Sequence, residues 1–295
     1  MNLYVLSFGF GLITASILAI ASVGFTLQFG VTNILNLAYG DVMTGCAFIA
    51  YLVTRAGGSL AEALLAGAAS GALASYGLNR FVYTPFVRRG TRMFGMIIVT
   101  ISVSLVLQNG LQGIFKATFF SLALPRPSSY TFAGMIFTSQ QFVIIALAVV
   151  AMLFVHALLS WTKLGRAMRA TAADPELARS CGIATDRVID VAWLLSGALC
   201  GTAGVALALN VTSFTSTAGG QFLIPIIAAA VLGGVGHPYG AMVGAVVIGL
   251  SAELSAAVIP PSYKEVVAFL ILIVVLLIRP QGIFAEVATQ KEVVA

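Results

Sequence analysis

Charge is scarce in this chain. Only 8% of its 295 residues are charged, 60% are hydrophobic, and the mean hydropathy is +1.04. Ordinary soluble domains carry roughly 25% charged residues. The composition therefore excludes a soluble globular domain and predicts an integral membrane protein.

Residues for catalysis and metal binding are also few. The three cysteines, Cys46, Cys181 and Cys200, have unrelated spacings, so no disulfide framework or metal site is indicated. The two histidines belong to no HExxH motif, and neither a GxSxG motif nor a paired-carboxylate pattern occurs. A GxxxxGK[ST] loop is absent too, so the chain has no P-loop for nucleotide phosphates. We expect no catalytic residues, no metal and no cofactor in this chain.

Long apolar runs, in contrast, fill the sequence. Backbone polar groups in lipid must be satisfied within the span, and runs of about 18 to 24 residues suit helices better than barrel strands. We predict an all-α, polytopic transmembrane bundle of about eight spans, two of them broken or re-entrant. The clear spans lie near Leu6–Leu27, Leu60–Asn79, Phe94–Phe115, Phe142–Trp161, Val188–Leu209, Tyr239–Val258 and Val266–Ile278, with a shorter apolar piece at Val42–Val53.

The basic residues indicate the orientation of the spans. They gather at 80–92, at 163–187 and from Arg279 onward, and the positive-inside rule makes these regions cytoplasmic. This distribution accounts for the net charge of +5, so nucleic-acid binding is not expected. Arg187 and Arg279 both lie in regions assigned to the cytoplasm, so the chain between them must cross the membrane an even number of times. Only three ordinary spans lie between these two residues. The segment 221–235 must supply the fourth.

Two segments look like interrupted helices. The segment 221–235 is short, contains Pro225, opens after Gly219-Gly220 and closes in Gly233-Gly234-Val235-Gly236. Residues 28–41 combine a break at Gly30 with polar side chains. Interrupted segments in both halves of a chain are typical of a transport path. Whether residues 31–39 cross the bilayer or dip and return stays open, and with it the side of the N-terminus.

Several polar residues fall at membrane depth. Such side chains either line a path for a polar solute or join helices by hydrogen bonds. Asp41 can also be a solvated cap, and Glu253 can be structural if it is paired. The candidates for a translocation path are Asn33, Asn36, Tyr39, Asp41, Gln108, Gln112, Gln221 and Glu253.

A polar island at 164–183 interrupts the apolar pattern. Asp174 can cap a helix, Pro175 suits its first position, Glu176 suits its positive end, and Gly182 can end it. A helix this short is not stable alone in water, because nucleation costs more than so few hydrogen bonds return. The island therefore predicts a docking partner.

These features resemble the LivH-type permease subunits of branched-chain amino acid ABC importers. The resemblance covers nearly the whole chain. Its most specific stretches are Gly30-Val-Thr-Asn-Ile-Leu-Asn-Leu-Ala-Tyr-Gly-Asp41, the island 165–183, Ala228-Ala-Ala-Val-Leu-Gly-Gly-Val-Gly236, and 262–269 leading to Arg279-Pro-Gln-Gly282.

The resemblance implies a set of partners and a location. It implies one permease domain over 1–295 in the bacterial inner membrane, a heterodimer with a second, LivM-like permease, two cytoplasmic ATPases that bind ATP and Mg²⁺, and a periplasmic solute-binding protein. Within a coupling loop at 162–187, a coupling helix from Pro175 to Cys181 would sit in a groove of an ATPase. The residues implied in coupling are Asp174, Pro175, Glu176, Leu177, Ala178, Arg179, Cys181 and Gly182, with Leu177, Ala178 and Cys181 forming one apolar face.

Departures from the family pattern leave the solute open. Tyr39 and Asp41 stand where the family commonly has His and Glu, and Pro225 stands where it commonly has a basic residue. The solute is therefore a branched-chain amino acid, another amino acid, urea or another amide, or a small organic acid. A stand-alone secondary transporter or channel is the rival, although it should carry more intramembrane acid and base pairs.

Overall fold

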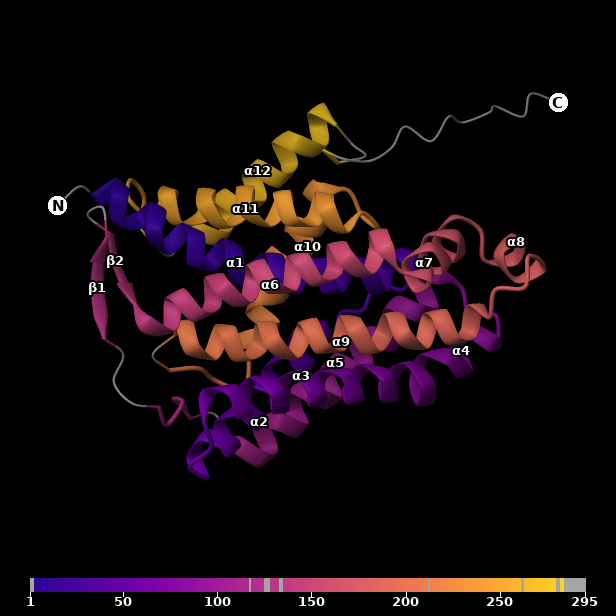
Figure 1. The fold of residues 1–295 in the computed structure, drawn as a ribbon, viewed down its shortest axis with the longest axis horizontal. Helices are drawn as coiled ribbons and strands as arrows, with labels where there is room; N and C mark the ends of the chain where they lie inside the picture. Colours follow the sequence, from indigo (N-terminus) through magenta and orange to yellow (C-terminus); the bar gives the residue numbers. More distant parts are fainter. Residues whose placement is uncertain are drawn as a thin grey trace.

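The structure is a computed structural model that describes residues 3–116, 118–124, 128–132, 135–211, 213–260, 263–279 and 282–283. Long helices run side by side along the longest axis of the molecule (Figure 1). The first elements are α1 (Leu3–Thr32), α2 (Tyr39–Arg55), α3 (Leu60–Gly77), the π-helix η1 (Leu78–Tyr83), α4 (Thr84–Arg88) and α5 (Met93–Phe115). The remaining helices are α6 (Ser139–Trp161), α7 (Lys163–Ala173), α8 (Pro175–Ser180), α9 (Thr185–Asn210), α10 (Ala218–Gly233), α11 (Pro238–Ser255) and α12 (Lys264–Ile278).

The all-α prediction is confirmed, with one small exception. A hairpin of β1 (Ser129–Phe132) and β2 (Met135–Thr138) pairs antiparallel, with Ser129 opposite Thr138. It lies at the end of the bundle opposite α8 and leads into α6 (Figure 1). An apolar scan misses it because each strand has only four residues.

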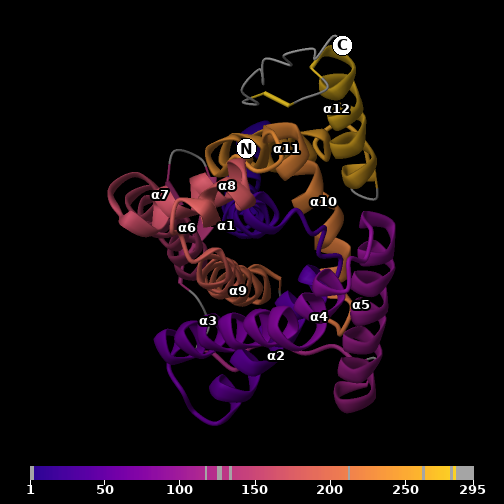
Figure 2. The same cartoon turned by 90° about the vertical axis from the view of Figure 1, so that its right-hand side faces the viewer.

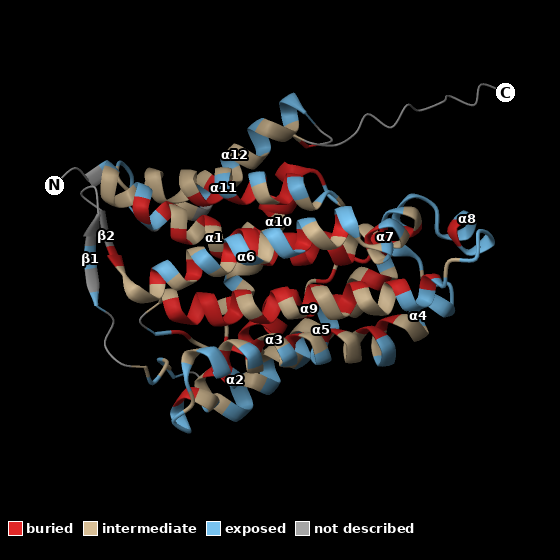
Figure 3. Ribbon diagram, viewed as in Figure 1, coloured by how far each residue is buried: buried red, intermediate tan, exposed pale blue. Residues whose placement is uncertain are grey.

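Helices α1 and α9 are the most buried of the long apolar helices. The most apolar stretch of α1 is 78% buried and that of α9 is 72% buried, against 11% for α5. Figure 2, looking along the bundle, shows α1 surrounded by α6, α9, α10 and α11, while α5 stands at the flank. The burial colours of Figure 3 follow this arrangement, with red concentrated on the inner helices. The exposed apolar sides of the flanking helices are therefore the surfaces left for lipid or for another subunit.

Five described helices are long and apolar enough to span a membrane: α1, α5, α6, α9 and α11. Helices α10 and α12 are shorter but apolar. The chain is therefore a polytopic helical membrane protein, as the composition predicts.

The first interruption lies at Asn33 and not at Gly30. Helix α1 continues through Gly30 to Thr32, and Asn33 leaves it with a φ of 54°. Asn visits this left-handed region more readily than most residues. Gly30 instead lies close to another backbone, because a Cβ there would be a tight 3.2 Å from the backbone of Gly236.

The second interruption comes before α10 instead of within it. Helix α10 runs through Pro225 without a break, and the non-helical chain is at 213–217. Residues 33–36 likewise precede α2. Each interruption thus follows a long core helix and precedes a helix that begins in the interior of the bundle.

Each of the two central helices, α1 and α9, packs closely against one neighbouring helix. Helix α3 packs on α9, and α11 packs on α1. Both crossings use small residues: a Cβ at Gly201 would collide with the backbone of Gly67 in α3, and one at Gly249 would collide with the backbone of Ala15 in α1. Glycine therefore allows both pairs of helices to pack closely.

The crossing of α3 and α9 gives a stability prediction. Gly201→Ala places a methyl group against the Gly67 carbonyl, so we expect a loss of about 1–3 kcal/mol or more in stability. Thermal unfolding in detergent, followed by size-exclusion chromatography, measures it. Gly110→Ala in α5 is the matched control, because nothing lies within 4 Å of a Cβ there. Equal melting temperatures for the two variants would contradict the tight crossing.

Candidate translocation and coupling sites

The N-termini of α2 and α10 meet inside the bundle. A Cβ at Gly40 or Gly219 would collide with the carbonyl of the other, so only glycine permits this approach. The Gly219 N–H donates to Thr44 Oγ1 at 2.9 Å, which satisfies one of the free amides at the start of α10. Two positive helix ends are thus brought together within the protein.

Asp41 lies beside this junction. Its side chain is on α2, is only 3% exposed, and accepts a hydrogen bond from the Ser104 hydroxyl of α5 through Oδ2. The other oxygen, Oδ1, faces α10: a Cβ at Gly220 would lie 3.7 Å from it. The described residues donate no hydrogen bond to Oδ1. A carboxylate therefore sits where two helix N-termini supply positive potential.

A polar stripe on α5 leads away from Asp41. Ser104, Gln108 and Gln112 follow one another at single-turn spacing, with Gln108 half-buried and Gln112 exposed. Gln221, in the first turn of α10, is exposed as well. Polar side chains on an apolar helix need water or protein opposite them.

Asn36 and Tyr39 lie in the core. Asn36 Oδ1 accepts a hydrogen bond from the Tyr83 hydroxyl at 3.0 Å, and its amide reaches Gln28 at 3.5 Å. Tyr39 donates to the Ala21 carbonyl of α1 at 3.0 Å and is fully buried. These bonds hold the non-helical stretch against α1 and η1.

The other two candidates lie elsewhere. Asn33 is exposed and lines a small cavity with Met93, at the start of α5. Glu253 pairs with Lys264 at 2.6 Å and accepts from Thr14 at 3.2 Å. It ties together α1, α11 and the start of α12, and this pairing accounts for an acid on an apolar helix.

Helix α8 has the caps that the island predicts. Asp174 Oδ1 accepts from the N–H groups of Glu176 at 2.9 Å and Leu177 at 3.0 Å. Pro175 occupies the first helical position. At the other end, Gly182 has a φ of 83° and Ile183 N–H returns to the Ala178 carbonyl, which closes a Schellman motif.

The island contains two helices, where the sequence predicts one. Helix α7, capped by Thr162, precedes α8, and its residues Gly165 and Met168 are buried. The exposed apolar face of α8 has fewer residues than the predicted set of Leu177, Ala178 and Cys181. Leu177 is 62% exposed and Cys181 is exposed, but Ala178 is only 4% exposed. Ala178 therefore packs within this chain.

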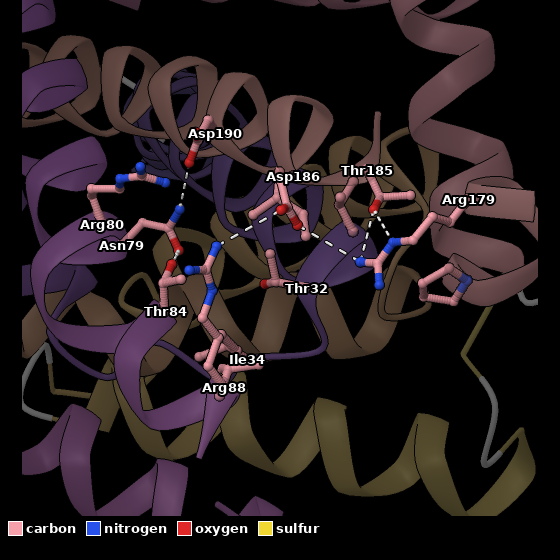
Figure 4. A pocket seen from close by; sticks show the side chains of 14 residues that line it. Thr32, Ile34, Asn79, Arg80, Thr84, Arg88, Arg179, Thr185, Asp186 and Asp190 are labelled. Atoms are coloured by element: carbon pink, nitrogen blue, oxygen red, sulfur yellow. Dashed lines mark hydrogen bonds and ion pairs between the residues drawn. The ribbon is translucent and has the colours of Figure 1, made fainter. Parts of the chain in front are cut away.

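A charged cavity of about 560 Å³ lies beside α8. Figure 4 shows side chains from η1, α4, α8 and α9 around it. Asp186 lies 3.8 Å from Arg88 and 3.7 Å from Arg179, and Asp190 accepts a hydrogen bond from Asn79 at 3.1 Å. The basic loops 80–92 and 163–187 thus meet at one end of the bundle.

Sequence reasoning misses several of these contacts. Ser104 is detectable as the residue one turn before Gln108. Thr44 and Asp190 carry no such pattern, because their partners are 175 and 111 residues away in the chain.

A helical bundle with two interior helix N-termini and a capped helix in a basic loop defines a membrane transport protein. The family model for the branched-chain amino acid transport system / permease component matches residues 7–276. The chain belongs to this family of ABC permeases.

Its relatives agree with this assignment. The high-affinity branched-chain amino acid permease LivH of Salmonella typhimurium is 32% identical, with 95% of each chain covered. BraD of Pseudomonas aeruginosa, also a high-affinity branched-chain amino acid permease, is 30% identical over the same shares. LsrC, an autoinducer 2 import permease of Escherichia coli, is 27% identical over 89% of this chain and 76% of its own.

A solved structure shares the fold. PsaBC from Streptococcus pneumoniae, solved in complex with Fab, aligns with a TM-score of 0.51 over 92% of this chain and 91% of its own, at 14% identity. The chain is thus a multi-pass, non-catalytic membrane component of a branched-chain amino acid ABC transport system. Membership in such a system implies ATPase and binding-protein partners.

A substitution at Glu253 tests whether this residue acts in stability or in transport. Glu253→Gln leaves Lys264 without its carboxylate, so we expect a loss of about 1–3 kcal/mol in stability. Thermal unfolding measures it, and uptake per folded molecule should stay unchanged. The double variant Glu253→Gln, Lys264→Met should recover part of the loss. Lost uptake at unchanged stability would instead place Glu253 in the path.

Proposed function

We propose that this chain forms half of the translocation path of an ABC importer for an α-amino acid. One observation supports it above the rest: the N-termini of α2 and α10 meet beside the buried carboxylate of Asp41. In transporters, half-helix N-termini attract anionic groups of the substrate.

We propose that the path runs along Asp41, Ser104, Gln108 and Gln112, with Gln221 opposite. A carboxylate of the solute would lie at the two helix ends, and its ammonium group would lie at Asp41 Oδ1. This pairing favours an amino acid over urea, another amide or an organic acid, since none of these carries both charges. Asn36 and Tyr39 then hold the interrupted chain in place.

We propose that the end with the basic loops faces the cytoplasm. Thr32, at the end of α1, and Thr185, at the start of α9, line the same cavity there. Phe48 of α2 packs on Phe214 toward the opposite end. Residues 33–55 would then cross the bilayer as a non-helical stretch followed by α2, which places the N-terminus outside. The crossing by residues 33–55, and the one by residues 213–217 together with α10, would then be only partly helical.

We propose that 1–295 is one permease domain and that α8 seats in a groove of an ATPase. The ATPases would bind ATP and Mg²⁺, a LivM-like permease would complete the path as a heterodimer, and a periplasmic protein would deliver the solute. The caps of α8 and the exposed Leu177 support this proposal. Movement of the ATPases would be transmitted through α8 to α9. The path would then open first to one side of the membrane and then to the other.

Replacement of the exposed leucine tests the coupling. Leu177→Lys puts a charge into the expected apolar groove, so copurification of the ATPase should weaken by at least about 30-fold, equivalent to about 2 kcal/mol. Solute-stimulated ATP hydrolysis should be lost while the permease stays folded. Leu177→Met is the matched control. Retained hydrolysis in the lysine variant would contradict the proposal, and transport without any ATPase would support the secondary-transporter rival.

Replacement of the buried carboxylate tests the path. Asp41→Asn keeps an oxygen for the Ser104 hydroxyl but removes the charge, so uptake of the amino acid should fall at least about tenfold. Radiolabelled uptake into proteoliposomes measures it, and melting temperatures should stay close to wild type. Asp41→Glu, which keeps the charge, should retain part of the activity. Unchanged uptake in Asp41→Asn would remove Asp41 from the path.

A further inference from the structure

The cavity beside α8 has the chemistry of a ligand site that the translocation path does not use. Its volume of about 560 Å³ falls in the range of small-molecule pockets, roughly 300 to 1,000 Å³. It is lined by three arginines and two aspartates, together with an apolar wall that includes Val31, Ile34 and Ile189. Charges of both signs therefore face an apolar surface.

These charges are only loosely engaged with one another. Asp186 lies 3.7 and 3.8 Å from Arg179 and Arg88, whereas contact pairs of this kind measure about 2.7–2.9 Å. All three side chains are roughly two-thirds exposed. Arg80 forms no ion pair with any residue in the described ranges, and in Figure 4 it lies near Asp190. Among the described residues, the cavity is thus lined by a cation without an ion pair and by a carboxylate that accepts one amide hydrogen bond.

We propose that this cavity binds a cytosolic α-amino acid with an apolar side chain and that the bound molecule slows import. Arg80 would take the carboxylate, Asp190 the ammonium group, and the apolar wall the side chain. The choice of amino acid and the cytosolic side both rest on the proposed function. The site is separate from the junction of α2 and α10.

The position of the cavity explains how a ligand there would act. Pro175 and Arg179 of α8 line one side, and η1 and α4 line the other. A molecule that bridges the two sides favours the arrangement seen here and opposes any movement of α8 away from α4. Its effect on transport follows from its preference for one of the two arrangements.

Binding is tested on the permease–ATPase complex in nanodiscs, without the binding protein. Radiolabelled leucine is the probe, and Asp41→Asn is present throughout to remove the path site. We expect saturable binding that Arg80→Gln or Asp190→Asn weakens at least about tenfold. The exposed Arg89, which does not line the cavity, provides the control Arg89→Gln. Neither 4-methylpentanoate nor 3-methylbutylamine, each lacking one charge, should compete.

Transport is tested in proteoliposomes loaded with ATP, with or without leucine, and supplied with binding protein outside. Internal leucine should lower the initial rate of uptake in wild type and in Arg89→Gln, but not in Arg80→Gln. Absence of binding in the Asp41→Asn background, or equal affinity in Arg80→Gln, overturns the inference. Failure of the proposed function would appear separately, as absent uptake in vesicles without internal leucine, and the binding result would still decide the cavity.

Discussion

Lipid offers no hydrogen bonds to the backbone, and each unsatisfied N–H or C=O there costs several kcal/mol. Two non-helical stretches, 33–36 and 213–217, are nevertheless part of this bundle. They persist because other groups satisfy and cover them: the Asn33 N–H donates to the Phe29 carbonyl, and Phe214 pairs with Phe120 through two backbone hydrogen bonds. The positions of α2 and α10 depend on this internal satisfaction.

Glycine allows the helices to pack closely enough to cover these non-helical stretches. Side chains between α3 and α9, or between α1 and α11, would hold the helices apart and open the interior. At Gly40 and Gly219 the same close approach brings two helix ends together, and Asp41 supplies the opposite charge beside them. Packing and electrostatics at this junction thus have one origin, the absence of side chains at a few positions.

The end with α8 follows a different physical rule. Its helices are short, polar and exposed, and it is joined by caps and loose ion pairs instead of buried apolar area. Such an element has little stability of its own and is suited to move or to dock. The bundle therefore combines a rigid glycine-packed interior with an adjustable charged end.

Interactions between neighbours in the chain made part of this structure predictable from the sequence. The helical class, the apolar spans and the caps of α8 depend on neighbours in the chain: Asp174 binds amides two and three residues away. Contacts across the chain decided the rest. The close approach of Gly30 to Gly236, the core position of Tyr39 and the pairing of Glu253 with Lys264 depend on which helices meet. No local pattern encodes that meeting, because an apolar helix fits equally well against lipid and against another apolar helix.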